Sequence, residues 1–116
     1  DAFSAESILS TRPAPDIVIV SGLYELFSDN RMVLTSLQAI GRHLQTGGCL
    51  IYTCQPWHPQ VEQIARTLIN RDGDPWIMRR RTQAEMDELV RAAGLEKVAM
   101  RIDEYGIFTV SVARKP

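Results

Sequence analysis

The stretch "SGLYELF" brings together three residues that can take part in chemistry. Gly22 permits a close approach of the backbone to a ligand. Tyr24 contributes an aromatic face, and Glu25 contributes a carboxylate that can orient a substrate. The alternative is an ordinary turn in which Tyr24 packs into the core and Glu25 has no special role. We interpret the stretch as a candidate active-site corner.

A second candidate group lies in "QPWHP", which combines an amide, an indole and an imidazole. His58 can remove a proton from a hydroxyl or an amine, because histidine changes its charge near neutral pH. Gln55 and Trp57 lie beside it and can contact a substrate. The alternatives are a capping or hydrogen-bonded role for His58 and simple packing for Trp57.

Three consecutive arginines, residues 79–81, precede a predicted helix. One of them, which we take to be Arg80, can bind a carboxylate or a phosphate through two parallel hydrogen bonds. Positive charge is unfavourable at the start of a helix, which favours a bound role. The alternative is a solvated run of charge. His43 is expected on a helix surface with no specific role.

Apolar runs lead into the first two candidate groups. "DIVIVS", residues 16–21, is a continuous β-branched run that predicts a strand covered on both faces, and "CLIYTC", residues 49–54, predicts a second strand. Two further strands, near 97–102 and 107–113, are close enough in sequence to pair antiparallel. Ligands of open α/β sheets bind outside the carboxyl ends of the strands. Both candidate groups begin at such an end.

Helices are predicted between these strands. Capping side chains at 28–30 begin a helix that ends near Leu44, and apolar residues at helical spacing between 61 and 69 predict another. Thr82 and Glu85 form a capping box that begins a third. The order strand, helix, strand, helix, helix, strand, strand predicts an α/β sheet with parallel strands first and an antiparallel finish.

The chain has 116 residues, a net charge of −1 and 45% hydrophobic residues, which predict one globular domain with no general affinity for nucleic acid. No apolar run approaches the roughly 20 residues of a membrane span. We expect an irregular segment over 1–15, with one short turn at 7–10, before an α/β body over 16–116. Cys49 and Cys54 are too far apart in a strand to form a disulfide, which indicates reduced thiols in a cytoplasmic protein. No metal-binding pattern is present.

Five blocks of the sequence resemble a bacterial methyltransferase domain that is often fused after an α/β-hydrolase domain. They are "DAF", "IVSGLYELFSDN", "LIYTCQPWHPQ", "WIMRRRTQAEMDELV" and "RIDEYGIFTVS". The element order is similar to the second half of a class I S-adenosylmethionine (SAM) methyltransferase, a Rossmann-like fold whose sheet ends in a reversed β-hairpin. The resemblance implies that "DIVIVS" and "CLIYTC" are strands four and five and that the last two strands are six and seven. Because the chain begins at "DAF", we expect only this C-terminal half, without strands one to three.

The resemblance also implies positions for the cofactor. Asp1 would accept a hydrogen bond from the adenine amino group, Phe3 would pack on the ring, and Tyr24 would face the sulfonium cation. The other cofactor-binding residues would be Ala2, Ser21, Gly22 and Leu23. At the start of the chain, Asp1 and Phe3 are expected to be frayed. The family's glycine-rich turn is missing from the sequence, so we expect these 116 residues alone to bind SAM poorly or not at all.

The resulting prediction is the acceptor side of a SAM-dependent methyltransferase, inactive by itself. Its catalytic residues would be Tyr24, Glu25 and His58, and its acceptor-binding residues Gln55, Trp57 and Arg80. The acceptor would be a small or lipid-like molecule. The alternative is a non-catalytic interaction or regulatory domain that serves a fused hydrolase. In either case the exposed edge of the first strand predicts self-association as a two-fold dimer.

Overall fold

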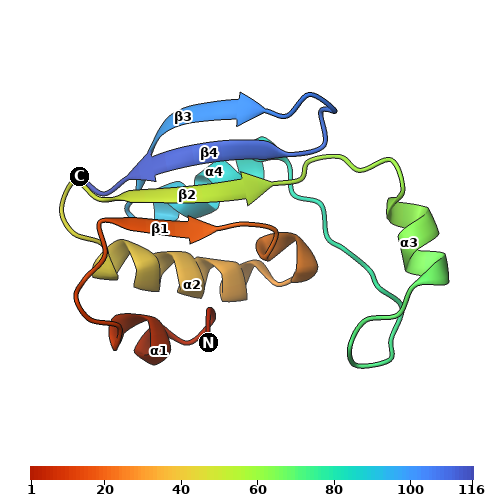
Figure 1. Ribbon diagram of the computed structural model, residues 1–116, viewed down its shortest axis with the longest axis horizontal. Helices are drawn as coiled ribbons and strands as arrows, with labels where there is room; N and C mark the ends of the chain where they lie inside the picture. Colours follow the sequence, from red (N-terminus) through yellow and green to blue (C-terminus); the bar gives the residue numbers. More distant parts are fainter.

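The computed structural model describes residues 1–116 as one four-stranded sheet with helices against it (Figure 1). The strands are β1 (Ile17–Val20), β2 (Cys49–Cys54), β3 (Glu96–Ile102) and β4 (Thr109–Arg114). The helices are α1 (Ala5–Leu9), the short 3-10 helix η1 (Tyr24–Leu26), α2 (Asn30–His43), α3 (Val61–Thr67) and α4 (Gln83–Ala92). The strand order is β1-β2-β4-β3. β1 and β2 are parallel, whereas β4 runs antiparallel to both β2 and β3. The predicted α/β class, with parallel strands first and an antiparallel finish, is confirmed.

The two long helices begin at the predicted capping residues. Asp29 accepts a hydrogen bond from the backbone N–H of Arg31 at the start of α2 (2.8 Å). Thr82 accepts one from the N–H of Glu85 at the start of α4 (3.1 Å). The reciprocal half of the predicted capping box is not formed, because the Glu85 carboxylate binds Asn30 and Arg79 instead. This exchange joins the starts of two helices that are far apart in the sequence.

The first fifteen residues contain a helix, where the sequence predicts an irregular segment with a turn at 7–10. The Ser4 hydroxyl caps α1 by accepting a hydrogen bond from the N–H of Ser7 (3.2 Å). The helix then packs against α2, as Figure 1 shows. A local cap and a tertiary contact therefore stabilise a segment whose two prolines, Pro13 and Pro15, act only after it ends.

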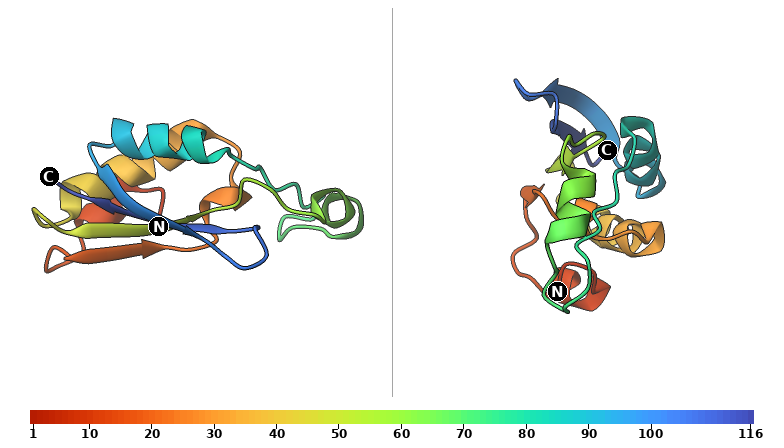
Figure 2. Two further views of the ribbon diagram at one scale, coloured as in Figure 1. Left: turned by 90° about the horizontal axis from the view of Figure 1, so that it is seen from above. Right: turned by 90° about the vertical axis from the view of Figure 1, so that its right-hand side faces the viewer.

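The core lies between the sheet and the helices α2 and α4, which cover one of its faces (Figure 2). Leu50 and Tyr52 of β2 point into it. Leu37 from α2 and Met86 from α4 pack on the same side. Side chains alternate along each strand, so every second residue of the sheet points the other way.

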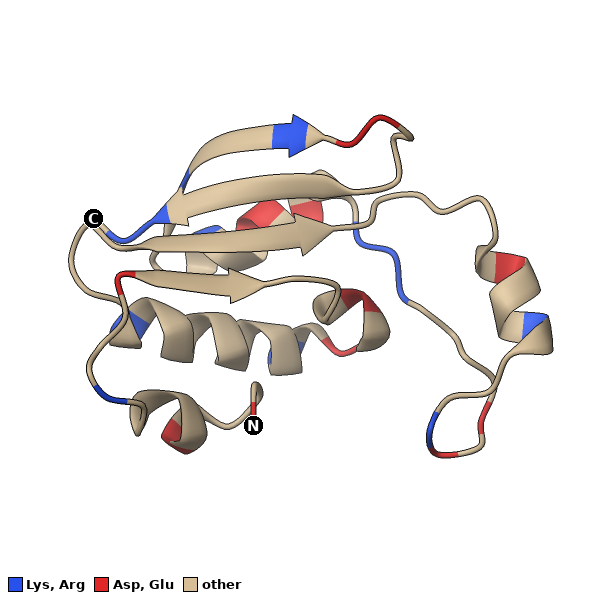
Figure 3. Cartoon of the chain, in the orientation of Figure 1, with Lys and Arg blue, Asp and Glu red and all other residues tan.

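The opposite face of the sheet is open. Ile17 and Ile19 of β1 are 60% and 66% exposed, and Val110 of β4 is exposed on the same face. The sequence predicts that the first strand is covered on both faces, which is wrong for these residues, because all the helices that pack on the sheet lie on one side (Figure 2). The strands of this face carry few charges, as Figure 3 shows.

The segment that follows β2 leaves the body of the fold. α3 buries none of its residues, and Leu68 and Ile69 lie beyond its end and are exposed. The predicted apolar stripe between 61 and 69 therefore does not form a buried face. α3 and the loop after it project past the ends of the strands, where no element lies opposite them (Figures 1 and 2). None of the helices combines the length and apolarity that a membrane crossing requires.

Candidate functional site

The corner predicted after the first strand lies where the parallel strands β1 and β2 both end (Figure 1). Gly22 adopts a φ of +63°, a conformation that favours glycine. Its N–H donates a hydrogen bond to the Thr53 hydroxyl on β2 (2.8 Å). A side-chain carbon built on Gly22 would meet no atom within 4 Å, so open space lies beside the corner.

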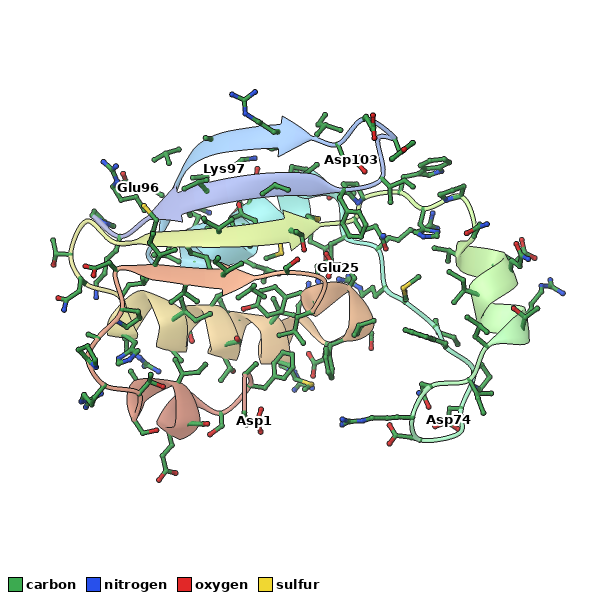
Figure 4. All side chains as sticks on the ribbon, in the orientation of Figure 1. Asp1, Glu25, Asp74, Glu96, Lys97 and Asp103 are labelled. Carbon is green, nitrogen blue, oxygen red and sulfur yellow. The ribbon has the colours of Figure 1, made fainter.

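Glu25 follows on η1 and points its carboxylate at the end of β2 (Figure 4). The residue is only 7% exposed. Its Oε1 accepts a hydrogen bond from the Thr53 hydroxyl (3.3 Å), and its Oε2 has no hydrogen-bond partner. Burial raises the pKa of Glu25, although its hydrogen bonds and the positive charge of Arg81 act in the opposite direction. A buried oxygen without a partner is costly, and burial therefore favours the protonated form of this carboxyl group.

Tyr24 lies in the core beside this carboxylate. It is buried, and its hydroxyl lies 2.9 Å from the Ser36 hydroxyl on α2. Burial raises the pKa of Tyr24 to about 12. The ring lies 6.3 Å, centre to centre, from the ring of Phe3. These contacts match the alternative in which Tyr24 packs into the core, because its hydroxyl faces α2.

The start of the chain lies against the same corner. The Asp1 carboxylate accepts a hydrogen bond from the N–H of Phe3 (2.9 Å), and the Asp1 carbonyl oxygen accepts one from the N–H of Ser4 (3.2 Å). The ring of Phe3 lies 4.4 Å from that of Phe27. The expected fraying of Asp1 and Phe3 is therefore wrong, because local hydrogen bonds and an aromatic cluster hold them.

A cavity of about 560 Å³ separates α1 from β1 and α2. Ala2, Ser21 and Leu23, three of the predicted cofactor-side residues, contribute to its lining. His43 lines the same cavity: it is buried, and its Nε2 has no hydrogen-bond partner. The expectation of a surface position for His43 is wrong, because the face of α2 that carries it packs toward α1 and the sheet edge.

The three residues of "QPWHP" are placed differently from one another. Gln55 is buried and lines a small cavity, of about 10 Å³, together with Glu25 and Thr53. The Nδ1 of His58 accepts a hydrogen bond from the N–H of Gln60 (3.0 Å), in the turn before α3. Trp57 is half exposed. The structure thus brings Gln55 to the carboxylate of Glu25, while His58 makes the local capping contact of its alternative reading.

The arginine run supplies the contacts that the sequence did not reveal. Arg81 is buried and donates hydrogen bonds to the carbonyl oxygens of Tyr24 and Phe27 and to the side-chain oxygen of Asn30, each at 2.7 Å. Arg79 is bonded to Asn30 (2.8 Å) and to the Glu85 carboxylate (2.6 Å). These two arginines fasten the segment before α4 to the corner after β1.

Arg80, the arginine predicted to bind the acceptor, is the exposed member of the run. Side chains two apart in an extended segment point the same way, so Arg79 and Arg81 turn inward together and Arg80 turns outward. The sequence feature that could have indicated the inward arginines is the unfavourable energy of three positive charges at the start of a helix. Backbone carbonyls, the amide oxygen of Asn30 and the Glu85 carboxylate, rather than a ligand, bind the guanidinium groups of Arg79 and Arg81. No cluster of three or more His, Cys, Asp or Glu residues is arranged to hold a metal ion.

The strand order, the corner at the carboxyl ends of β1 and β2, and the antiparallel finish define a Rossmann-like α/β fold of the methyltransferase type. Residues 1–115 match the model of the family described as "Putative methyltransferase", and the chain belongs to this family. The Escherichia coli (strain K12) protein YnbC is 55% identical over 114 residues, which are 97% of this chain and 20% of that protein.

Two solved structures show how far the fold extends. A possible exported protein from Bordetella parapertussis matches with a TM-score of 0.75 and 23% identity, over 100% of this chain and 42% of that one. Human N-acetylserotonin methyltransferase, solved in complex with SAM, matches with a TM-score of 0.67 and 16% identity, over 99% of this chain and 32% of that one. The chain thus spans about a fifth of its curated relative and less than half of each of these structures.

The corner meets one requirement of a SAM site, which is room beside the backbone. The open space at Gly22 leaves room beside the backbone, and the bare Oε2 of Glu25 lies buried at the same corner. The N–H of Gly22 is already bonded to Thr53, so the corner offers space and an acceptor atom rather than a set of free backbone donors.

Proposed function

We propose that the protein that carries this chain is a SAM-dependent methyltransferase and that these residues form the acceptor side of its site. The observation that carries the proposal is the buried carboxylate of Glu25, with one oxygen free of partners, at the carboxyl ends of two parallel strands. Family membership supplies the reaction class. Ligands of open α/β sheets bind at these strand ends.

Bound SAM supplies an electrophilic methyl group. The residues of this chain would position the acceptor and handle its proton. Glu25 would accept a hydrogen bond from the acceptor's hydroxyl or amine, with the Thr53 hydroxyl fixing the other carboxylate oxygen. His58 would take the proton through Nε2, because its Nδ1 is bonded to Gln60. Tyr24 would shape the corner through its ring.

The remaining predicted residues would complete the two sides of the site. Asp1, Ala2 and Phe3 lie next to the corner and would contact the adenosine part of SAM together with residues 21–23. Gln55 would contact the acceptor beside Glu25. Trp57 and Arg80, whose side chains are exposed, would contact the acceptor from the outside.

The rest of the SAM site would come from outside these 116 residues, which have no glycine-rich turn. The isolated chain would therefore be inactive. We further propose that the complete protein also carries an α/β-hydrolase domain. The free thiols of Cys49 and Cys54 support a cytoplasmic location. The apolar open face of the sheet supports a two-fold dimer of the isolated chain.

Isothermal titration with S-adenosylhomocysteine tests the proposal. The complete protein should bind it with a micromolar dissociation constant, and the 116-residue chain should bind it at least about a hundredfold more weakly. Absence of binding by the complete protein would contradict methyl transfer. Tight binding by the 116 residues would contradict the division of the site.

A further inference from the structure

A cleft of about 460 Å³ lies between the residues around η1 and the loop that follows α3. Its apolar lining comes from Leu23, Leu26 and Phe27 on the inner wall and from Ile69, Trp76 and Ile77 on the outer wall. Pockets for small molecules have volumes of about 300–1,000 Å³ and mostly apolar linings. The cleft has the size and the surface of such a pocket.

The base of the cleft is fixed by hydrogen bonds. The backbone N–H of Arg79 donates to the carbonyl oxygen of Glu25 (3.0 Å). The Arg81 guanidinium binds the carbonyls of Tyr24 and Phe27. These bonds hold the segment 79–81, which continues from the outer wall, against the turn that carries the inner wall.

Backbone groups of the outer wall form hydrogen bonds with one another. Asn70 and Asp74 are joined by a backbone hydrogen bond (2.8 Å), and Ile69 pairs with Pro75. The N–H of Trp76 donates to the carbonyl oxygen of Leu68 (3.0 Å). This loop therefore offers its side chains rather than a free strand edge, which disfavours a peptide that would bind by strand addition.

The side chains of the cleft remain in contact with water. Ile69 and Ile77 are 70% and 71% exposed, and Leu26 and Trp76 are exposed as well. Covering apolar surface of this extent is favourable. An apolar body held between the two walls would bury all four side chains at once.

The charges around the cleft disfavour an anionic ligand. Arg71, the only cationic residue in its lining, lies beside Asp72, with Nε 3.9 Å from the carboxylate. The guanidinium groups of Arg79 and Arg81 at its base are already hydrogen-bonded. The lining thus carries one charge of each sign, Arg71 and Asp72, so a carboxylate or phosphate would meet no net positive charge against these apolar walls.

We infer that this cleft binds the body of a neutral, apolar small molecule. The inference that this molecule is the methyl acceptor rests on the proposed function, because Leu23, Leu26 and Phe27 flank Glu25 on the same turn. The acceptor is then an apolar hydroxyl or amine compound, and carboxylic and phosphoric acids are excluded.

The test uses the complete protein and the neutral fluorescent probe N-phenyl-naphthylamine. The probe should bind saturably, and Ile77→Asp should weaken its binding at least about fivefold, because a charge enters an apolar wall. Ile102→Asp is the matched control, since Ile102 is an equally large and exposed side chain on β3. Its probe affinity should stay within about twofold of the wild type.

Competition tests the class of ligand. Naphthol should displace the probe at least about tenfold more effectively than naphthoate, which is similar in shape but anionic. The inference is overturned if the probe does not saturate, if both isoleucine variants lose affinity equally, or if naphthoate competes as well as naphthol.

Titration with S-adenosylhomocysteine separates this inference from the proposed function. Ile77→Asp should retain the cofactor-product affinity of the wild type within about twofold. If the complete protein binds S-adenosylhomocysteine but not the probe, the inference about the cleft is overturned and the proposed function is not. Probe binding with the expected variant effect, but without binding of S-adenosylhomocysteine, supports the cleft and contradicts methyl transfer.

Discussion

Glu25 lies in an environment that differs from the one its residue type prefers. A carboxylate is normally solvated or fully paired, yet one oxygen of this side chain is buried without a partner. The other oxygen accepts from Thr53, which in turn accepts from Gly22. A short chain of hydrogen bonds therefore orients the carboxyl group and leaves its second oxygen buried without a partner.

Glu25→Gln should change how the stability depends on pH. Burial raises the pKa of Glu25 above its ordinary value of 4.5, so its neutral form stabilises the fold. That contribution is present below the ordinary value and is lost as the pH rises through the folded-state pKa. The variant should therefore gain free energy of unfolding relative to the wild type as the pH rises across this range.

Urea unfolding at a series of pH values measures this difference. Glu104→Gln, at an exposed turn, controls for the loss of one negative charge. If the Glu25→Gln and wild-type curves run parallel over the whole range, the carboxyl group does not titrate in the way its burial requires.

At the scale of elements, the segment 79–81 decides how the corner is held. It links the start of α4 to η1, which it reaches through the carbonyls of Tyr24 and Phe27. η1 is a single turn with carbonyls that its own backbone does not fully satisfy. Arg81 donates hydrogen bonds to these carbonyls, so the corner depends on a contact between residues more than fifty positions apart in the sequence.

Arg81→Met should lower the free energy of unfolding by about 3 kcal/mol, because it leaves buried acceptors without donors. Arg80→Met makes the same chemical change at the exposed neighbour and should cost less than about 0.5 kcal/mol. Denaturant titrations of both variants give the two values. Equal losses would mean that the buried guanidinium adds nothing beyond its apolar stem.

At the scale of the whole molecule, the sheet is covered on one face only. Ile17, Ile19 and Val110 form an apolar surface that water contacts, and β1 has an unpaired edge. Exposed edges and apolar faces of this kind favour association. We expect that the isolated chain covers this surface by pairing with a second copy.

Sedimentation of the 116-residue chain should show a dimer at high concentration. Ile19→Asp should shift it toward the monomer, because a charge on the open face must be desolvated in the interface. Ile102→Asp, on the edge strand β3, controls for the general effect of the charge. A wild-type chain that stays monomeric at high concentration would contradict this association.

The order of elements was predictable because it depends on local pattern. The β-branched runs, the capping residues Asp29 and Thr82 and the glycines after the helices act over a few residues. Such signals indicate strands and helices and, through their alternation, the mixed sheet. The pattern failed for α1, where packing on α2 supports a short helix, and for the stripe of α3, which has no partner.

The candidate site was predictable only in part. Parallel pairing places Gly22, Glu25 and Thr53 at one end of the sheet, so the corner followed from two strand ends. Which of the arginines turn inward did not follow, because the three have the same local character. The partners of Arg81 come from a turn more than fifty residues earlier.

The sequence by itself determined the class of fold and the location of the corner, since both follow from short-range periodicity and turn chemistry. The tertiary structure alone decided that Glu25 is buried with one oxygen that has no hydrogen-bond partner. It also decided that Arg81 hydrogen-bonds to the carbonyls at η1 and that an apolar cleft opens beside η1. The physical reason is that burial and pairing are properties of groups that meet in space, and these groups come from distant parts of the chain.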